Sequence, residues 1–301
     1  MDNIQNKGVD FTKLQGATLI ATFFSLWLAV YFEHDIENLL AYILILSFGM
    51  LHGANDIKLL QVEAKKKSKP YDFLRILAYY IFFVLSVAGL FYLLPSIALG
   101  LFILFSAYHF GEQHWISKIS GNPLFLIFFY TAYGLVILFL LFAAHNTEVS
   151  DIIFDIIGIY INNGYYQIIL GISFFVFVVL YLTKYKQSNT NIFLELFYLL
   201  VFFIIFNTAS LLWAFAIFFI LWHAIPSLGD QITYLYGDLS RKHFIKYVRS
   251  SLIYWLASVS TLVILFFFID GSSDGFIPFL FSFLAAITFP HVLVISGLNK
   301  N

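Results

Sequence analysis

Long apolar stretches separated by short polar breaks make up most of the chain. Two of them, 76–94 and 252–269, contain no Lys, Arg, Asp or Glu, and crossing the hydrocarbon of a bilayer takes roughly 20 such residues. The pattern therefore predicts an all-α, polytopic integral membrane protein. The ten expected transmembrane helices cover 14–32, 39–57, 73–94, 96–115, 123–143, 166–183, 192–206, 208–228, 250–269 and 276–297.

The expected helices form one transmembrane domain, 14–297, between two short tails, 1–13 and 298–301. The first tail lacks the apolar core and small-residue cleavage site of a secretory signal, so we interpret it as a cytoplasmic tail. The break between the seventh and eighth helices depends only on Asn207, Thr208 and Ser210.

The positions of the basic residues test this topology independently. Loops on the cytoplasmic side of a membrane are enriched in Lys and Arg. All 16 basic residues fall in the two tails and the even-numbered connections, whereas the opposite loops carry only acidic charges. Both termini are therefore expected in the cytoplasm, with the protein in the cell (inner) membrane. The basic residues are Lys7, Lys13, Lys58, Lys65, Lys66, Lys67, Lys69, Arg75, Lys118, Lys184, Lys186, Arg241, Lys242, Lys246, Arg249 and Lys300.

The composition of the chain limits the kinds of ligand and metal site that it can have. Hydrophobic residues make up 61% of the chain and charged residues 11%, far from the balance of a soluble domain. The net charge of −1 argues against binding nucleic acid. Cysteine is absent, so a bound metal would need histidine or oxygen ligands.

Four of the eight histidines are expected at one depth in the membrane. Each lies about 13–15 residues from the start of its helix, roughly 20 Å from the outer face. Neutral imidazoles at a common depth point to a metal site for iron, copper or zinc. The alternative is that each histidine separately hydrogen-bonds a neighbouring helix. These candidate metal ligands are His52, His109, His223 and His291. His34, His145 and His243 are expected in solvated loops.

Carboxylates near these histidines are candidates for supporting them. Asp56, Glu112 and Asp230 follow a candidate ligand by four, three and seven residues, which places each near the same helix face. Metal-bound histidines usually donate their second N–H to such a group. For Asp56 and Asp230, a solvated position at a cytoplasmic helix end explains the pattern nearly as well.

His114 follows His109 by five residues, about 140° around a helix. The two imidazoles therefore cannot easily share one site. We expect His114 to support the site or lie at the membrane interface.

The spacing and the aromatic residues give two further constraints. No two histidines are three or four residues apart, so the clustered histidine boxes of di-iron membrane enzymes are absent and a single metal is expected.

Most of the 38 Phe suit a lipid-facing surface. Some aromatic residues could instead line a tunnel for an apolar substrate, with Tyr108, Phe110, Phe219 and Trp222 as candidates.

The motifs around the histidines resemble those of the Brp/Blh family of bacterial and archaeal membrane β-carotene 15,15′-dioxygenases. They are Leu51-His52-Gly53-Ala54-Asn55-Asp56, Tyr108-His109-Phe110-Gly111-Glu112-Gln113-His114-Trp115, Trp222-His223-Ala224-Ile225-Pro226-Ser227 with Asp230-Gln231, and Phe289-Pro290-His291. Their order and spacing cover nearly the whole chain.

This resemblance implies an activity. Iron(II) and O₂ would cleave the central double bond of β-carotene into two retinal molecules, with no catalytic side chain needed beyond the metal ligands. The retinal would serve a microbial rhodopsin in the same cell.

Two other classes of function fit the same residues. Intramembrane histidines also occur in transporters and channels that move protons or metal cations. Pro226 and Pro290 interrupt two helices near histidines, as in the broken helices of transporters. A non-catalytic partner of a rhodopsin is the third possibility.

Overall fold

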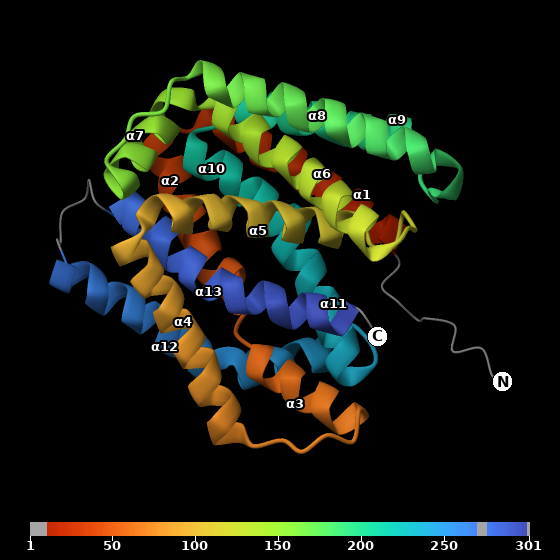
Figure 1. Ribbon diagram of the computed structural model, residues 1–301, viewed down its shortest axis with the longest axis vertical. Helices are drawn as coiled ribbons and strands as arrows, with labels where there is room; N and C mark the ends of the chain where they lie inside the picture. Colours follow the sequence, from red (N-terminus) through yellow and green to blue (C-terminus); the bar gives the residue numbers. More distant parts are fainter. Residues whose placement is uncertain (1–10, 270–275, 300–301) are drawn as a thin grey trace.

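The computed structural model describes residues 11–269 and 276–299, and this part of the chain is helical with no β-strand (Figure 1). The first half contains α1 Phe11–Tyr31, α2 His34–Leu44, the π-helix η1 Ile45–Gly49, α3 Asp56–Lys66, α4 Phe73–Leu93, α5 Pro95–Trp115, α6 Pro123–Ala144 and α7 Asn146–Ile157. The second half contains α8 Gly164–Lys184, the 3₁₀ turn η2 Tyr185–Gln187, α9 Ile192–Thr208, α10 Leu211–Ala216, the π-helix η3 Ile217–Ala224, α11 Ile225–Tyr236, α12 Arg241–Ile269 and α13 Phe276–Asn299.

Each of the ten expected ranges is helical over most of its length, but two segments differ from the sequence prediction. The range 39–57 is not one helix, because the chain makes turns at 52–55 before α3 begins. The expected loop after α6 contains the amphipathic helix α7, which ends at Ile157 and is followed by Gly158 with a φ of 73°. A glycine accepts this left-handed conformation at low cost.

Parts of the prediction fall outside the described residues. The expected tails 1–13 and 298–301 lie largely there, with Lys7 and Lys300. Asp270 and Asp274, two of the acidic residues in the loops expected on the side opposite the cytoplasm, lie there too.

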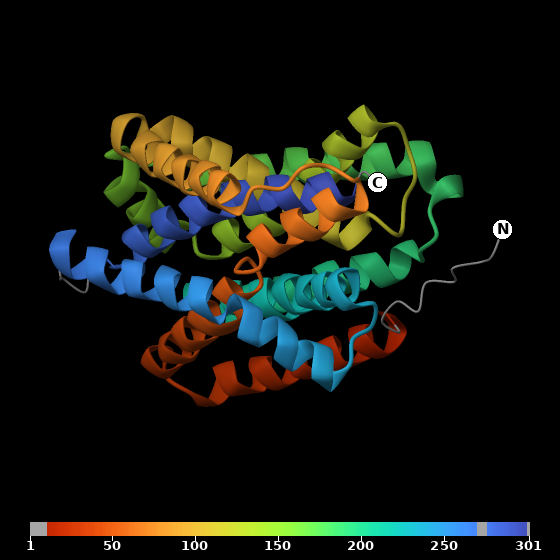
Figure 2. The ribbon, with the colours of Figure 1, turned by 90° about the horizontal axis from the view of Figure 1, so that it is seen from below.

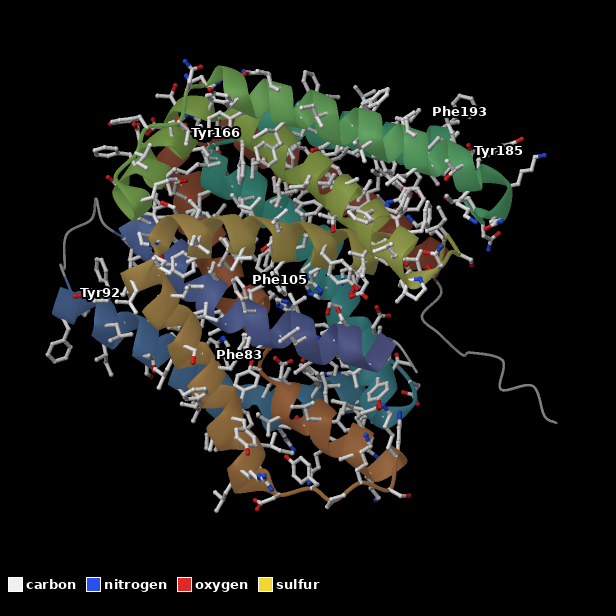
Figure 3. The ribbon with its side chains drawn as sticks, in the orientation of Figure 1. Phe83, Tyr92, Phe105, Tyr166, Tyr185 and Phe193 are labelled. Atoms are coloured by element: carbon white, nitrogen blue, oxygen red, sulfur yellow. The ribbon has the colours of Figure 1, made fainter. Side chains whose placement is uncertain are left out.

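Within the described residues, six helices are long and apolar enough to cross a membrane: α4, α6, α8 extended to Gln187, the α10–η3–α11 segment, α12 and α13. The part of α1 from Gly16 and all of α9 form shorter apolar helices. Large aromatic side chains are exposed at opposite ends of the bundle, with Tyr92 at one end and Tyr185 and Phe193 at the other (Figure 3). Such exposed aromatic residues are typical of the two membrane–water interfaces.

The closest helix packing joins α5 to α6. A Cβ added at Gly111 would lie 2.0 Å from the Tyr130 carbonyl oxygen, and one added at Gly134 would lie 1.8 Å from the Ala107 oxygen. Only glycine allows the two backbones to approach so closely, as at many helix contacts in membranes. This contact fixes the part of α5 that carries His109.

The helices of the bundle are arranged in layers. Figure 2 shows α1 and α2 on one face of the bundle and α4 and α5 on the opposite face, with α13 and the α10–η3–α11 segment between them. The two π-helices η1 and η3 pack against each other inside the bundle. π-turns are rare and often occur at functional sites, and these two adjoin His52 and His223.

Candidate functional site

Four separate elements bring the four candidate ligands together. His52 follows η1, His109 lies in α5, His223 in η3 and His291 in α13. The four rings contact one another in a closed cycle, with centroids 5.3 Å apart for His52–His223, 4.7 Å for His223–His109, 5.3 Å for His109–His291 and 4.8 Å for His291–His52. All four residues are at most 6% exposed.

These ring separations agree with ligation of one ion. With nitrogen about 2.1 Å from a metal, an imidazole centre lies roughly 3.2 Å from it, so rings set about 90–110° apart have centres roughly 4.5–5.2 Å apart. The observed separations run from 4.7 Å, inside this range, to 5.3 Å, just above it. As the side chains stand, no three His, Cys, Asp or Glu among the described residues form a closed metal-binding group.

The hydrogen bonds of the imidazoles favour a ligand over simple packing. Nδ1 of His52 contacts the Gly49 carbonyl oxygen, and Nδ1 of His291 lies 2.8 Å from Oδ1 of Asp56. Nε2 of His291 and both ring nitrogens of His109 and His223 are buried without a hydrogen-bond partner in the described structure. A buried polar atom left unpaired costs about 1–3 kcal/mol. Histidines that bind a metal commonly pair Nδ1 in this way, which leaves Nε2 available to the ion.

Asp56 pairs with a histidine on a distant helix rather than with the one four residues earlier. Its carboxylate is 2% exposed. Oδ1 lies beside His291, and Oδ2 accepts a 2.8 Å hydrogen bond from Tyr80 on α4. The i, i+4 argument does not apply because residues 52–55 are not helical. The turn instead directs Asp56 toward α13.

Helix α12 holds the same turn from the other side. The fully buried Tyr247 donates to Gln231 Oε1 at 2.8 Å and lies 3.2 Å from the His52 carbonyl oxygen. Asn55 donates to the Tyr247 carbonyl oxygen, and Ser250 donates to Asn55. These bonds fix the backbone that carries His52.

The other predicted supporting residues lie farther from the imidazole cycle. Glu112 accepts hydrogen bonds from Tyr108 and Ser296, at 2.7 and 2.8 Å. Asp230 is exposed and accepts a 2.7 Å hydrogen bond from Gln113. Glu112 thus links α5 to α13, and Asp230 links α11 to α5.

His114 belongs to a separate buried cluster, with Glu195 on α9 and Lys118 after α5. Its Nε2 lies 2.6 Å from Glu195 Oε2 and 2.9 Å from the Lys118 ammonium. Lys118 also donates to Glu195 Oε1 at 2.8 Å. Burial lowers the pKa of the Lys118 ammonium, an effect opposed by the adjacent carboxylate. This cluster ties α5 to α9.

The three histidines expected in loops lie apart from the cycle, but two of them are not in loops: His34 begins α2 and His243 lies in the first turn of α12, whereas His145 lies between α6 and α7. His34 and His145 each lie near a glutamate three residues later, at 3.5 and 3.6 Å, and His243 lies 2.8 Å from Asp238. These contacts are local in the sequence.

An apolar cavity begins at the imidazole cycle. All four histidines line it, and its other lining residues are apolar except Ser106 and Thr288. Two of the tunnel candidates, Phe110 and Phe219, line the cavity. Tyr108 instead hydrogen-bonds Glu112, and Trp222 donates to Thr22 on α1 and packs against aromatic rings of α9.

Sequence reasoning missed Tyr80, Tyr247 and the α7 residues that line the cavity. A tyrosine inside an apolar stretch gives no signal of the residue it contacts. The signal for α7 was its pattern of apolar residues at Val149, Ile152, Ile153 and Ile156, which follows one helical face.

Over residues 43–299 the sequence matches the family described as Beta-carotene 15,15′-dioxygenase. No curated protein and no solved structure matches.

Proposed function

The chain belongs to the beta-carotene 15,15′-dioxygenase family, and from this premise we propose that it cleaves the central double bond of β-carotene with O₂ at an iron(II) held by His52, His109, His223 and His291. In this reaction the central bond breaks, and each of its two carbons takes one oxygen atom to become an aldehyde. β-Carotene and O₂ thus balance two molecules of retinal, and no reductant is consumed.

The observation that carries the proposal is the cycle of buried imidazoles at the end of an apolar cavity. Their unpaired nitrogens suit a borderline metal such as iron when thiolates are absent. Bound iron(II) would supply the activation of O₂. Neutral ligands leave the charge of the ion uncompensated, and four of them leave coordination positions open.

The chain itself positions the ligands and the substrate. Asp56 accepts the Nδ1 proton of His291, and the Gly49 carbonyl does so for His52. Both bonds favour the tautomer that leaves Nε2 unprotonated and available to a metal. Phe219 stacks on His223 with centroids 5.7 Å apart, and Phe110 contacts the same ring at 4.8 Å. These rings exclude water beside the site, which prevents side reactions.

Topology and localisation form part of the proposal. We place ten spans in the inner membrane with both termini in the cytoplasm, supported by the segregation of all 16 basic residues and the positive-inside rule. β-Carotene dissolved in lipid then reaches the site without crossing water. The retinal would supply a microbial rhodopsin.

Expression in bacteria that make β-carotene tests the function. We expect loss of orange colour and accumulation of retinal, with no change in cells that express a His109→Ala/His223→Ala double variant. Persistence of β-carotene in cells that contain folded, iron-loaded protein would refute the enzyme and favour a transporter or a rhodopsin partner.

A further inference from the structure

The cavity extends from the imidazole cycle toward one end of the bundle. On α5, on the α10–η3 segment and on α13, the lining residues come before the histidine in the chain, with Phe110 as the exception. Four more lining residues come from α7. Helix α7 lies across this end, with apolar residues facing the cavity and acidic residues facing away. Ser150 anchors it through a 2.9 Å hydrogen bond to Tyr166 on α8. Figure 3 shows Tyr166 at this end of the bundle.

A second, polar pocket lies beyond the end of the cavity. Its polar lining includes Asn38, His145, Glu148, Asp151 and Ser210. The apolar cavity and the polar pocket share three lining residues: Ile152 on α7, Leu211 on α10 and Phe281 on α13. These three side chains therefore form the boundary between the two spaces. The Phe281 ring is held there by an edge contact with Phe215, at 5.5 Å between centroids.

The distance from the imidazole cycle to this boundary matches the length of half a carotenoid molecule. Phe281 precedes His291 by ten residues of one helix, roughly 15 Å at 1.5 Å per residue. Leu211 precedes His223 by twelve, roughly 17 Å when the π-segment is taken into account. A conjugated chain advances roughly 1.2 Å per carbon, so half of a forty-carbon carotenoid with its end ring extends about 15 Å from the central bond.

We propose that Phe281, Leu211 and Ile152 form an end stop for the terminal ring of the substrate, and thereby select the central double bond for cleavage. This inference rests on the proposed function. The end ring enters the cavity until it meets the three side chains, and the bond then beside the imidazoles is the central one. The stop also separates the ring from the polar pocket, where an apolar group gains nothing from burial.

Moving the end stop should move the position at which the polyene is cleaved. Phe281→Ala vacates the space of one ring, enough for the chain to advance by the two carbons that bring the next double bond to the histidines. We expect the two unequal products of this cleavage, a methyl ketone from the methyl-bearing carbon and a longer aldehyde from the other, to rise roughly tenfold relative to retinal, since small changes in an apolar pocket alter selection by about 10–200-fold. Phe268→Ala is the matched control, because Phe268 is 84% exposed. Product chromatography on purified iron-loaded protein measures the effect.

A binding measurement separates the stop from the chemistry. Retinol, one ring with half a polyene, should bind metal-free wild-type protein with a fluorescence change, and Leu211→Trp should weaken this binding roughly tenfold by shortening the cavity. The stop is refuted if Phe281→Ala, or the milder Phe281→Leu should the former not fold, gives wild-type product ratios. Unchanged retinol binding by Leu211→Trp also refutes it. If the wild type cleaves no carotenoid, the proposed function fails, and the retinol comparison still decides whether the boundary limits cavity length.

Discussion

Replacing Asp56 by alanine should weaken iron binding without unfolding the protein. Asp56 is 2% exposed, and Oδ1 accepts the Nδ1 proton of His291 at 2.8 Å. The variant leaves this buried N–H without an acceptor, which costs about 1–3 kcal/mol. At about 1.4 kcal/mol per decade, that cost corresponds to roughly 5- to 150-fold weaker metal binding. Loss of an outer carboxylate from other histidine metal sites weakens binding over a similar range, about 10–100-fold.

Two further variants set the scale for this prediction. Asp56→Asn keeps an oxygen that can accept from His291, so it should retain more iron than the alanine variant. Tyr80→Phe removes only the O–H donor to Oδ2 and should have the smallest effect.

Iron retained in detergent-purified protein across a chelator series, with thermal unfolding recorded in parallel, measures all three variants. The reasoning is refuted if Asp56→Ala releases iron at the wild-type chelator concentration and its unfolding temperature is unchanged.

Three other predictions follow from the same geometry. The purified protein should hold about one iron per chain, and two irons, or full activity with zinc, would contradict a single iron site. Replacing any one histidine of the cycle by alanine should abolish retinal formation, while the same change at His34, His145 or His243 should leave most of it; a loop histidine found essential would contradict the assignment. Gly134→Ala should lower the free energy of unfolding by at least about 1–3 kcal/mol, because its Cβ would lie 1.8 Å from the Ala107 oxygen. Gly171→Ala, with nothing within 4 Å, is the control for thermal unfolding, and equal melting temperatures would contradict the packing argument.

The helices and the four clustered histidines could be anticipated from the sequence because both depend on local pattern. Apolar length marks a helix that crosses a bilayer, and position along a helix gives depth. These arguments place His52, His109, His223 and His291 at one level, and the structure brings their rings into contact.

The partners of these residues could not be anticipated, because they depend on where the helix is interrupted. The contact of Asp56 with His291 follows from the turn at 52–55, and the sequence of that turn does not say toward which helix the next side chain points. Trp222 stands one position from His223, yet it faces Thr22 on α1 rather than the cavity. A neighbouring position in the sequence does not settle which way a side chain points.

Because of the two π-helices, the number of residues through η1 and η3 is more constrained than their chemical composition. A π-turn contains more residues than an α-turn, so deleting one residue from η1 or η3 would restore a regular helix. Everything after the deletion would then rotate by about 100°. His52 lies three residues after η1 and His223 lies near the end of η3, so each imidazole would turn away from the cycle while the hydropathy of the chain barely changed. Relatives with the same chemistry should therefore vary freely in loop length but keep the residue count through these two helices fixed.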